Sequence, residues 1–198
     1  MDPARFQKAI EAFDRANAED PHTVTNDATG PEPRELVQAR RLSAWVNELE
    51  PNASEALSLA ARCQHIRRWQ VPRDAHPAGR VGYLQWRTRL ARFHADTAAQ
   101  LLQSVGYEQD LIDAVRRINL KQNLRSSPDS QIMEDALCLS FLEHELEDFS
   151  AKYPVEKVVE VVQKTWQKMS ERARERALTL PFSAASLSVI QRALAPLA

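Results

Sequence analysis

Apolar residues recur along most of this chain at every third or fourth position, which is the spacing of one face of an α-helix. Phe6, Ile10 and Phe13 show the pattern first, and Pro21 follows the end of that helix. The same spacing predicts helices over residues 5–18, 33–49, 52–69, 83–105, 108–121, 129–151, 154–169 and 183–194. Between them, residues 22–33, 71–82 and 122–128 are predicted as loops or connections. We therefore expect an all-α, single-domain helical bundle of about seven or eight helices, with a core over 5–178 and a C-terminal tail over 179–198 that holds a short helix.

Three of the predicted helix ends have a recognisable capping residue. Asn52 followed by Glu55 resembles a capping box at a helix start. Gly106 suits the left-handed position that closes a helix, and Pro154 suits a first turn.

The composition favours helices and disfavours a membrane span. Hydrophobic residues make up 43% of the 198 residues, charged residues make up 27%, and only 4 are glycine, which argues against many tight hairpins. No apolar run approaches the roughly 20 residues that a span needs, and residues 1–5 lack an apolar signal core. We expect a cytoplasmic protein without a membrane partner, in which Cys63 and Cys138 are buried free thiols.

Charge is distributed unevenly along the chain. The segment from Arg62 to Arg92 has eight arginines, no lysine and one acid, a net charge of +7, whereas the rest of the chain carries −8. Guanidinium groups suit bidentate contacts with phosphate and carboxylate. A solvated basic surface would explain the charge as well, but the exclusive use of arginine favours a site for a small anion.

A few polar residues lie where the helical pattern calls for apolar ones, namely Gln38, His94 and Asp135. A buried carboxylate is costly unless it is paired, hydrogen-bonded or bound to a metal. His94 and Asp135 therefore fit either a buried His–Asp pair or a metal site. His65 lies opposite its helix's apolar stripe, on the side that also carries Arg62 and Trp69.

Several short motifs make the chain resemble the domain-of-unknown-function 4202 family, over about residues 5–178. These motifs are Gln64–Trp69, Val71–Arg73, Gly82–Arg87, Phe93–Ala95, Met133–Asp135 and Lys164–Ser170. This resemblance implies no particular activity.

A more distant resemblance is to the HD-domain metallohydrolases. The order Gln38, Gln64-His65, His94 and Asp135 follows their ligand layout on successive helices. The chain departs from that pattern because Gln38 replaces the first His and Gln64-His65 replaces a His-Asp pair. Glu35 or Glu134 could supply the missing carboxylate.

The resemblance implies a divergent metal-dependent hydrolase acting on a phosphate ester or a nucleotide-like anion. His65, His94 and Asp135 would hold one divalent metal ion of unspecified identity, and Glu134 and His65 would be the catalytic residues. The anion would be bound by four arginines and two tryptophans, which are Arg67, Arg68, Arg73, Arg87, Trp69 and Trp86.

The alternative is a binding module without chemistry. It would hold a nucleotide, an anionic metabolite or single-stranded RNA on the same arginine- and tryptophan-rich segment. The acidic remainder disfavours duplex DNA. A third hypothesis is a protein adaptor that uses Lys164–Ser170. Nucleophile-elbow, P-loop and dinucleotide-binding motifs do not occur in the sequence.

Overall fold

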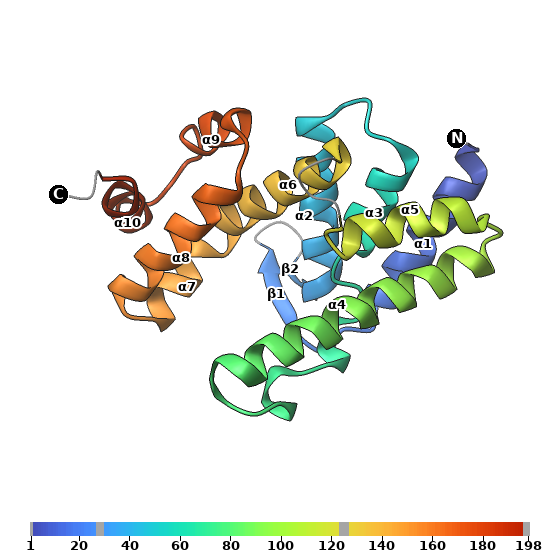
Figure 1. Ribbon diagram of the computed structural model, residues 1–198, viewed down its shortest axis with the longest axis horizontal. Coiled ribbons are helices and arrows are strands. Elements are labelled where there is room, and N and C mark those ends of the chain that lie inside the picture. The colour runs from blue at the N-terminus through green and yellow to red at the C-terminus, as the bar shows by residue number, and fades with distance from the viewer. Residues whose placement is uncertain (1, 27–29, 123–126, 196–198) are drawn as a thin grey trace. The chain divides into compact units, whose positions relative to one another are not determined.

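The computed structural model describes residues 2–26, 30–122 and 127–195, which form two compact units, residues 1–130 and 131–198. Figure 1 labels the helices and strands of both units. We describe each unit by itself.

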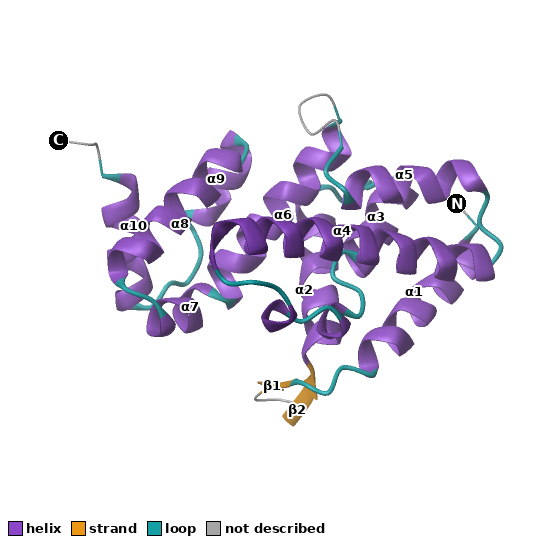
Figure 2. Cartoon of the chain, turned by 60° about the horizontal axis from the view of Figure 1, so that its bottom comes forward, coloured by secondary structure: helices purple, strands orange, loops and turns teal. Residues whose placement is uncertain are grey.

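Among the described residues, unit 1 contains five complete α-helices and the start of a sixth, which Figures 1 and 2 label. They are α1 (Pro3–Ala18), α2 (Arg34–Leu49), α3 (Glu55–Cys63), α4 (Gly79–Ser104), α5 (Gln109–Asn119) and the first residues of α6 (Pro128–His144). Two short 3₁₀ helices, η1 (Arg68–Gln70) and η2 (Arg73–Ala75), lie between α3 and α4. α3 packs against α1, α2 and α5 and supplies fully buried side chains, Leu57 and Leu59, to the core.

A small antiparallel hairpin precedes α2, where a loop over 22–33 was predicted. β1 (Thr23–Asn26) pairs with β2 (Gly30–Pro33), and Val24 lies opposite Glu32. The buried carboxylate of Asp20 accepts hydrogen bonds from the backbone N–H groups of His22 and Glu35, at 2.9 and 3.0 Å. The loop prediction was wrong because these strands are short and rich in proline, and their stability comes from this long-range contact.

The start and end of α3 also differ from the prediction. Ser54, not Asn52, is the N-cap, and its hydroxyl accepts from the N–H of Leu57 at 3.0 Å. The helix ends at Cys63 rather than near Trp69, and Arg67 has a left-handed backbone (φ 50°). That conformation breaks the helix and turns the chain toward η1.

α4 begins at Gly79, four residues before the predicted start at Tyr83, and extends to Ser104. Gly82, in its first turn, has no side chain where the loop passes closest, since an added Cβ would overlap the carbonyl of Pro77. Gly106 has φ 85° just beyond the helix, which confirms its predicted capping position.

Unit 2 consists of the remainder of α6 with α7 (Leu146–Lys152), α8 (Val155–Lys168), α9 (Glu171–Ala177) and α10 (Ala184–Leu194). α8 packs against α10, and Val158, Val162 and Leu146 are fully buried. The predicted helix over 129–151 is divided at Glu145, whose backbone (φ −123°, ψ −19°) departs from helical geometry. α9 was not predicted, and it begins at the N-cap Ser170.

The all-α fold class is confirmed. The described residues form ten α-helices rather than seven or eight, because one predicted helix is divided and α9 was missed. Within the described residues, no helix combines the length and apolarity needed to cross a bilayer. Cys63 and Cys138 are both buried free thiols, as predicted.

Candidate functional site

His94 lies on the buried side of α4, in the middle of its apolar stripe, and only 3% of it is exposed. Its Nδ1 lies 2.7 Å from the carbonyl oxygen of Ile66, in the turn after α3. A carbonyl only accepts, so Nδ1 must carry the proton and Nε2 must present a lone pair. Nε2 is buried and has no hydrogen-bond partner among the described residues. The side chain therefore offers one unused acceptor inside the protein.

His65 is the nearest aromatic neighbour of His94 from another element, with ring centroids 5.9 Å apart and planes inclined by 54°. Burial lowers the pKa of His65 well below its usual value, and the positive charges of Arg68, Lys121 and Arg87 act in the same direction. Burial, with Arg68 and Arg87, also lowers the pKa of His94 to about 4, although the hydrogen bond to Ile66 opposes this. Both imidazoles are neutral at pH 7.

Arg68 and Arg87 bring positive charge to this histidine pair without a compensating acid. Within the described part of the chain, neither guanidinium forms an ion pair, and both side chains are at least partly exposed. Arg68 lies over the ring of Trp86, 5.4 Å from its centroid. Trp86 is itself fixed, because its indole N–H donates to the carbonyl of Val71 at 2.9 Å. The indole thus holds Arg68 in place by a cation–π contact.

The backbone around the histidine pair is unusual. Of the described non-glycine residues, only Arg67 and Lys121 have positive φ, 50° and 55°. The positive charges of Lys121 and of Arg68, the next residue after Arg67, both lower the pKa of His65. Such conformations cost free energy and are common at functional sites. Gln64 is buried beside His65, and its Oε1 has no partner among the described residues. We call His65, His94, Arg68, Arg87 and Gln64 the histidine–arginine site.

Other arginines of the basic segment are used by the fold. Arg62 forms a bidentate pair with Asp14, at 2.6 and 2.7 Å. Arg67 pairs with Glu19 at 3.0 Å, and its backbone N–H donates to the side-chain oxygen of Asn17 at 3.1 Å. Arg73 donates to the carbonyl oxygen of His76 at 3.0 Å and so braces the loop before α4.

The remaining predicted site residues of unit 1 include Trp69 and Gln38, which are half-buried, and Glu35, which is buried. Lys121 and Asn119, which lie near the site, were not predicted from the sequence as site residues. Asn119 donates to the sulfur of Cys63 at 3.3 Å, while its Oδ1 has no partner in the described residues. No periodic signal marks these two residues, because they stand at the end of α5 where polar residues are ordinary.

Asp135 and Glu134 belong to unit 2 and have partners there. The carboxylate of Asp135 accepts from the N–H and hydroxyl of Ser170, at 2.8 and 2.6 Å, and from Gln131 at 3.0 Å. It thus anchors the start of α9. Glu134 is buried, and the Nζ of Lys168 lies 3.5 Å from its carboxylate.

The Lys164–Ser170 motif is largely accounted for by these contacts. Ser170 is the α9 N-cap, Lys168 pairs with Glu134, and Lys164 pairs with Glu160. Across the residues that the structure describes, no three His, Cys, Asp or Glu side chains gather as a metal-ligand set. The metal ligands His65, His94 and Asp135 stay a prediction.

Comparison with known proteins bears on the family. No curated protein and no solved structure matches the chain. The resemblance to HD-domain metallohydrolases stays a prediction. One family model, described as Domain of unknown function (DUF4202), matches residues 7–190, which are nearly the whole chain. The chain therefore belongs to the DUF4202 family.

Proposed function

We propose that the histidine–arginine site binds a small phosphate ester that also carries a hydroxyl group, such as a nucleotide or a sugar phosphate. The observation that carries this proposal is the buried Nε2 of His94, which has no hydrogen-bond partner among the described residues, beside two arginines that form no ion pair with a described acid. A buried polar atom without a partner is rare in folded proteins and calls for an explanation.

The guanidinium groups and the His94 imidazole would bind different parts of one ligand. Arg68 and Arg87 are donors only and favour phosphate oxygens. The Nε2 of His94 is an acceptor at neutral pH, so it favours a hydroxyl donor rather than a bare anion. A phosphate ester of a hydroxylated molecule satisfies both, whereas inorganic sulfate satisfies only the arginines.

Calorimetric titration tests the proposal with adenosine monophosphate, glucose 6-phosphate and sulfate as probes. We expect at least one phosphate ester to bind and sulfate to bind more weakly. Replacing both arginines, Arg68→Ala with Arg87→Ala, should weaken ester binding by about 100-fold or more, since each charge-assisted contact contributes about 1.5–3 kcal/mol. His94→Gln should weaken the ester and leave sulfate unchanged.

The matched control is Arg89→Ala with Arg92→Ala, which removes the same amount of charge from another side of α4. Both residues are exposed and form no ion pair with a described residue. Ester binding should be unchanged in this variant. Equal weakening in both double variants would mean that net charge, and not the histidine–arginine site, attracts the ligand.

A metal-dependent hydrolase is the second candidate, and the same Nε2 favours it. A histidine that binds a metal ordinarily donates its other nitrogen to a carbonyl or carboxylate, as Nδ1 of His94 does to Ile66. His65 and His94, both in unit 1, would hold the ion. The ion would lower the pKa of a bound water. Asp135 is already hydrogen-bonded to Ser170, so this candidate rests on the histidines.

Metal content separates the two candidates. After incubation with zinc or manganese and desalting, elemental analysis should find about one ion per chain if the hydrolase candidate holds, and far less in the variant His65→Asn with His94→Gln. Phosphate-ester hydrolysis should fall in parallel. Binding of the ester without retained metal or turnover would favour the non-catalytic binding module.

A further inference from the structure

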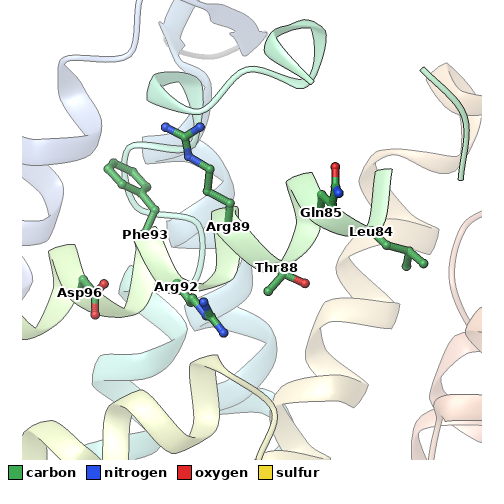
Figure 3. A pocket seen from close by; sticks show the side chains of 7 residues that line it. All are labelled: Leu84, Gln85, Thr88, Arg89, Arg92, Phe93 and Asp96. Atoms are coloured by element: carbon green, nitrogen blue, oxygen red, sulfur yellow. The ribbon is translucent and has the colours of Figure 1, made fainter. Parts of the chain in front are cut away.

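A second surface of α4, on a different side from the histidine–arginine site, has an open recess of about 660 Å³. Figure 3 shows its lining side chains, all of which come from α4. They are Leu84, Gln85, Thr88, Arg89, Arg92, Phe93 and Asp96. Val81, whose helical position lies between those of Thr88 and Arg92, is 71% exposed on the same side. We call this surface the outer face of α4.

The charge on the outer face is not neutralised. Arg89 and Arg92 are one turn apart and exposed, and within the described residues neither forms an ion pair. The acid of this face, Asp96, pairs with Arg116 at 2.7 Å. Of the four arginines between Gly79 and Ala95, Arg89 and Arg92 lie on this face, and that stretch of sequence has no acid. The outer face is therefore complementary to a negatively charged partner.

The apolar side chains narrow the class of partner. Leu84 is 53% exposed and Val81 is 71% exposed, although such aliphatic groups gain most when they are covered. Nucleic acids would use the arginines and Phe93 but leave the aliphatic groups in water. A lipid surface needs one continuous apolar side, whereas Gln85, Thr88 and the arginines lie among the apolar residues of this face.

We propose that the outer face of α4 docks an acidic amphipathic helix of a partner protein. The partner's apolar residues, spaced three or four apart, lie against Val81 and Leu84. Its glutamates or aspartates pair with Arg89 and Arg92. A helix laid along another helix, with axes about 8–10 Å apart, is a common mode of recognition. The contact is short, so the affinity is modest and falls with salt.

Fluorescence anisotropy tests the proposal with a labelled 20-residue helical peptide that has leucine on one side and glutamate beside it. We expect saturable binding with a Kd on the order of 10–100 µM, given the short interface. Arg89→Glu with Arg92→Glu should weaken it more than about tenfold. Leu84→Ser should weaken it without changing its salt dependence. A peptide with lysine in place of glutamate should bind the charge-reversed protein better than the original protein.

The matched control is Arg15→Glu with Arg192→Glu, which reverses two exposed charges on α1 and α10. It should leave peptide binding unchanged, and circular dichroism should show that both double variants are folded. Equal loss in the control would overturn the proposal. So would binding of a 12-residue oligouridine, or of vesicles containing phosphatidylserine, that requires Arg89 and Arg92 while the acidic peptide does not bind. Protection of Leu84→Cys from maleimide would show the face to be covered already and would also overturn it.

Discussion

At the scale of single residues, His94 couples stability to pH. Its pKa is lowered to about 4 in the folded protein, against about 6.5 when exposed. Below pH 6.5 the unfolded chain takes up this proton and the folded protein does not, so stability falls as the pH falls from 6.5 to 4. Linkage gives a loss of about 2 kcal/mol between pH 7 and pH 5 from this residue. Urea unfolding at the two pH values, in the original protein and in His94→Gln, should show the difference.

The pH effect should be partly retained in His94→Gln, because burial lowers the pKa of His65 in the same direction. The stability of the variant His65→Asn with His94→Gln should depend less on pH than that of either His94→Gln or the original protein. Thr88→Ala, an exposed substitution that removes no titratable group, serves as the control and should keep the full dependence. An unchanged slope in the double variant would contradict the assignment of two neutral imidazoles in the folded protein.

Cys63 gives a second prediction for a single residue. Burial raises the pKa of its thiol to about 12, although the hydrogen bond from Asn119 acts the other way. Only the thiolate reacts, so in a Cys138→Ser background the folded protein should react with iodoacetamide at pH 8 more than about 1000-fold more slowly than the protein unfolded in urea. Mass spectrometry measures both rates. Fast labelling of the folded protein would mean that the α3–α5 contact opens readily.

The sequence predicted some of these residues and not others, for a physical reason. His94 was identified because a polar residue interrupts an apolar stripe, and that pattern is local. The partners of Arg62 and Arg67 are Asp14 and Glu19, about 50 residues away, and neighbouring residues give no sign of such pairs. Asp135 was correctly expected to be buried, but its hydrogen bonds to Ser170 depend on α9, which was missed.

At the scale of secondary-structure elements, Gly82 sets how closely the loop before α4 approaches the helix. Alanine ordinarily stabilises a helix by about 1 kcal/mol relative to glycine. Here the added Cβ would overlap the carbonyl oxygen of Pro77, so the loop must move. We expect Gly82→Ala to lower the free energy of unfolding by about 1–3 kcal/mol, as overpacking does. Denaturant unfolding measures this, with Thr88→Ala, an exposed change on the same helix, as control. A net stabilisation would mean that the loop gives way freely.

The elements themselves were predicted where periodicity is long and missed where it is short. α2 was predicted to within one residue, because 16 residues of regular spacing leave little choice. The left-handed residue Arg67 and the 3₁₀ helix after it follow no periodic signal, since an arginine is not expected at positive φ. The interruption at Glu145 also follows no sequence signal, because no proline or glycine lies there.

At the scale of the whole molecule, the net charge of −1 conceals two cationic surfaces on one helix. Arg87 serves the histidine–arginine site and Arg89 serves the outer face. Successive residues are 100° apart around a helix, so these two side chains diverge by roughly 160°. One element can thus present two binding surfaces that share no side chain. The basic segment that composition marks as a single feature is divided by helical geometry into two.

Separate surfaces should give separable losses of binding. Arg68→Ala with Arg87→Ala should weaken phosphate-ester binding by about 100-fold or more and leave the acidic peptide's Kd within about twofold, because Arg87 projects from another side of α4 and exposed charges are screened at 0.15 M salt. Arg89→Glu with Arg92→Glu should do the reverse. Titrating each probe in the presence of a saturating amount of the other measures the coupling free energy between the two sites. We expect it to be near zero. Coupling needs an element with two arrangements, and α4 is one continuous helix. Competition between the two probes for one site, with each pair of arginines weakening both, would mean that the basic segment acts as a single undivided surface.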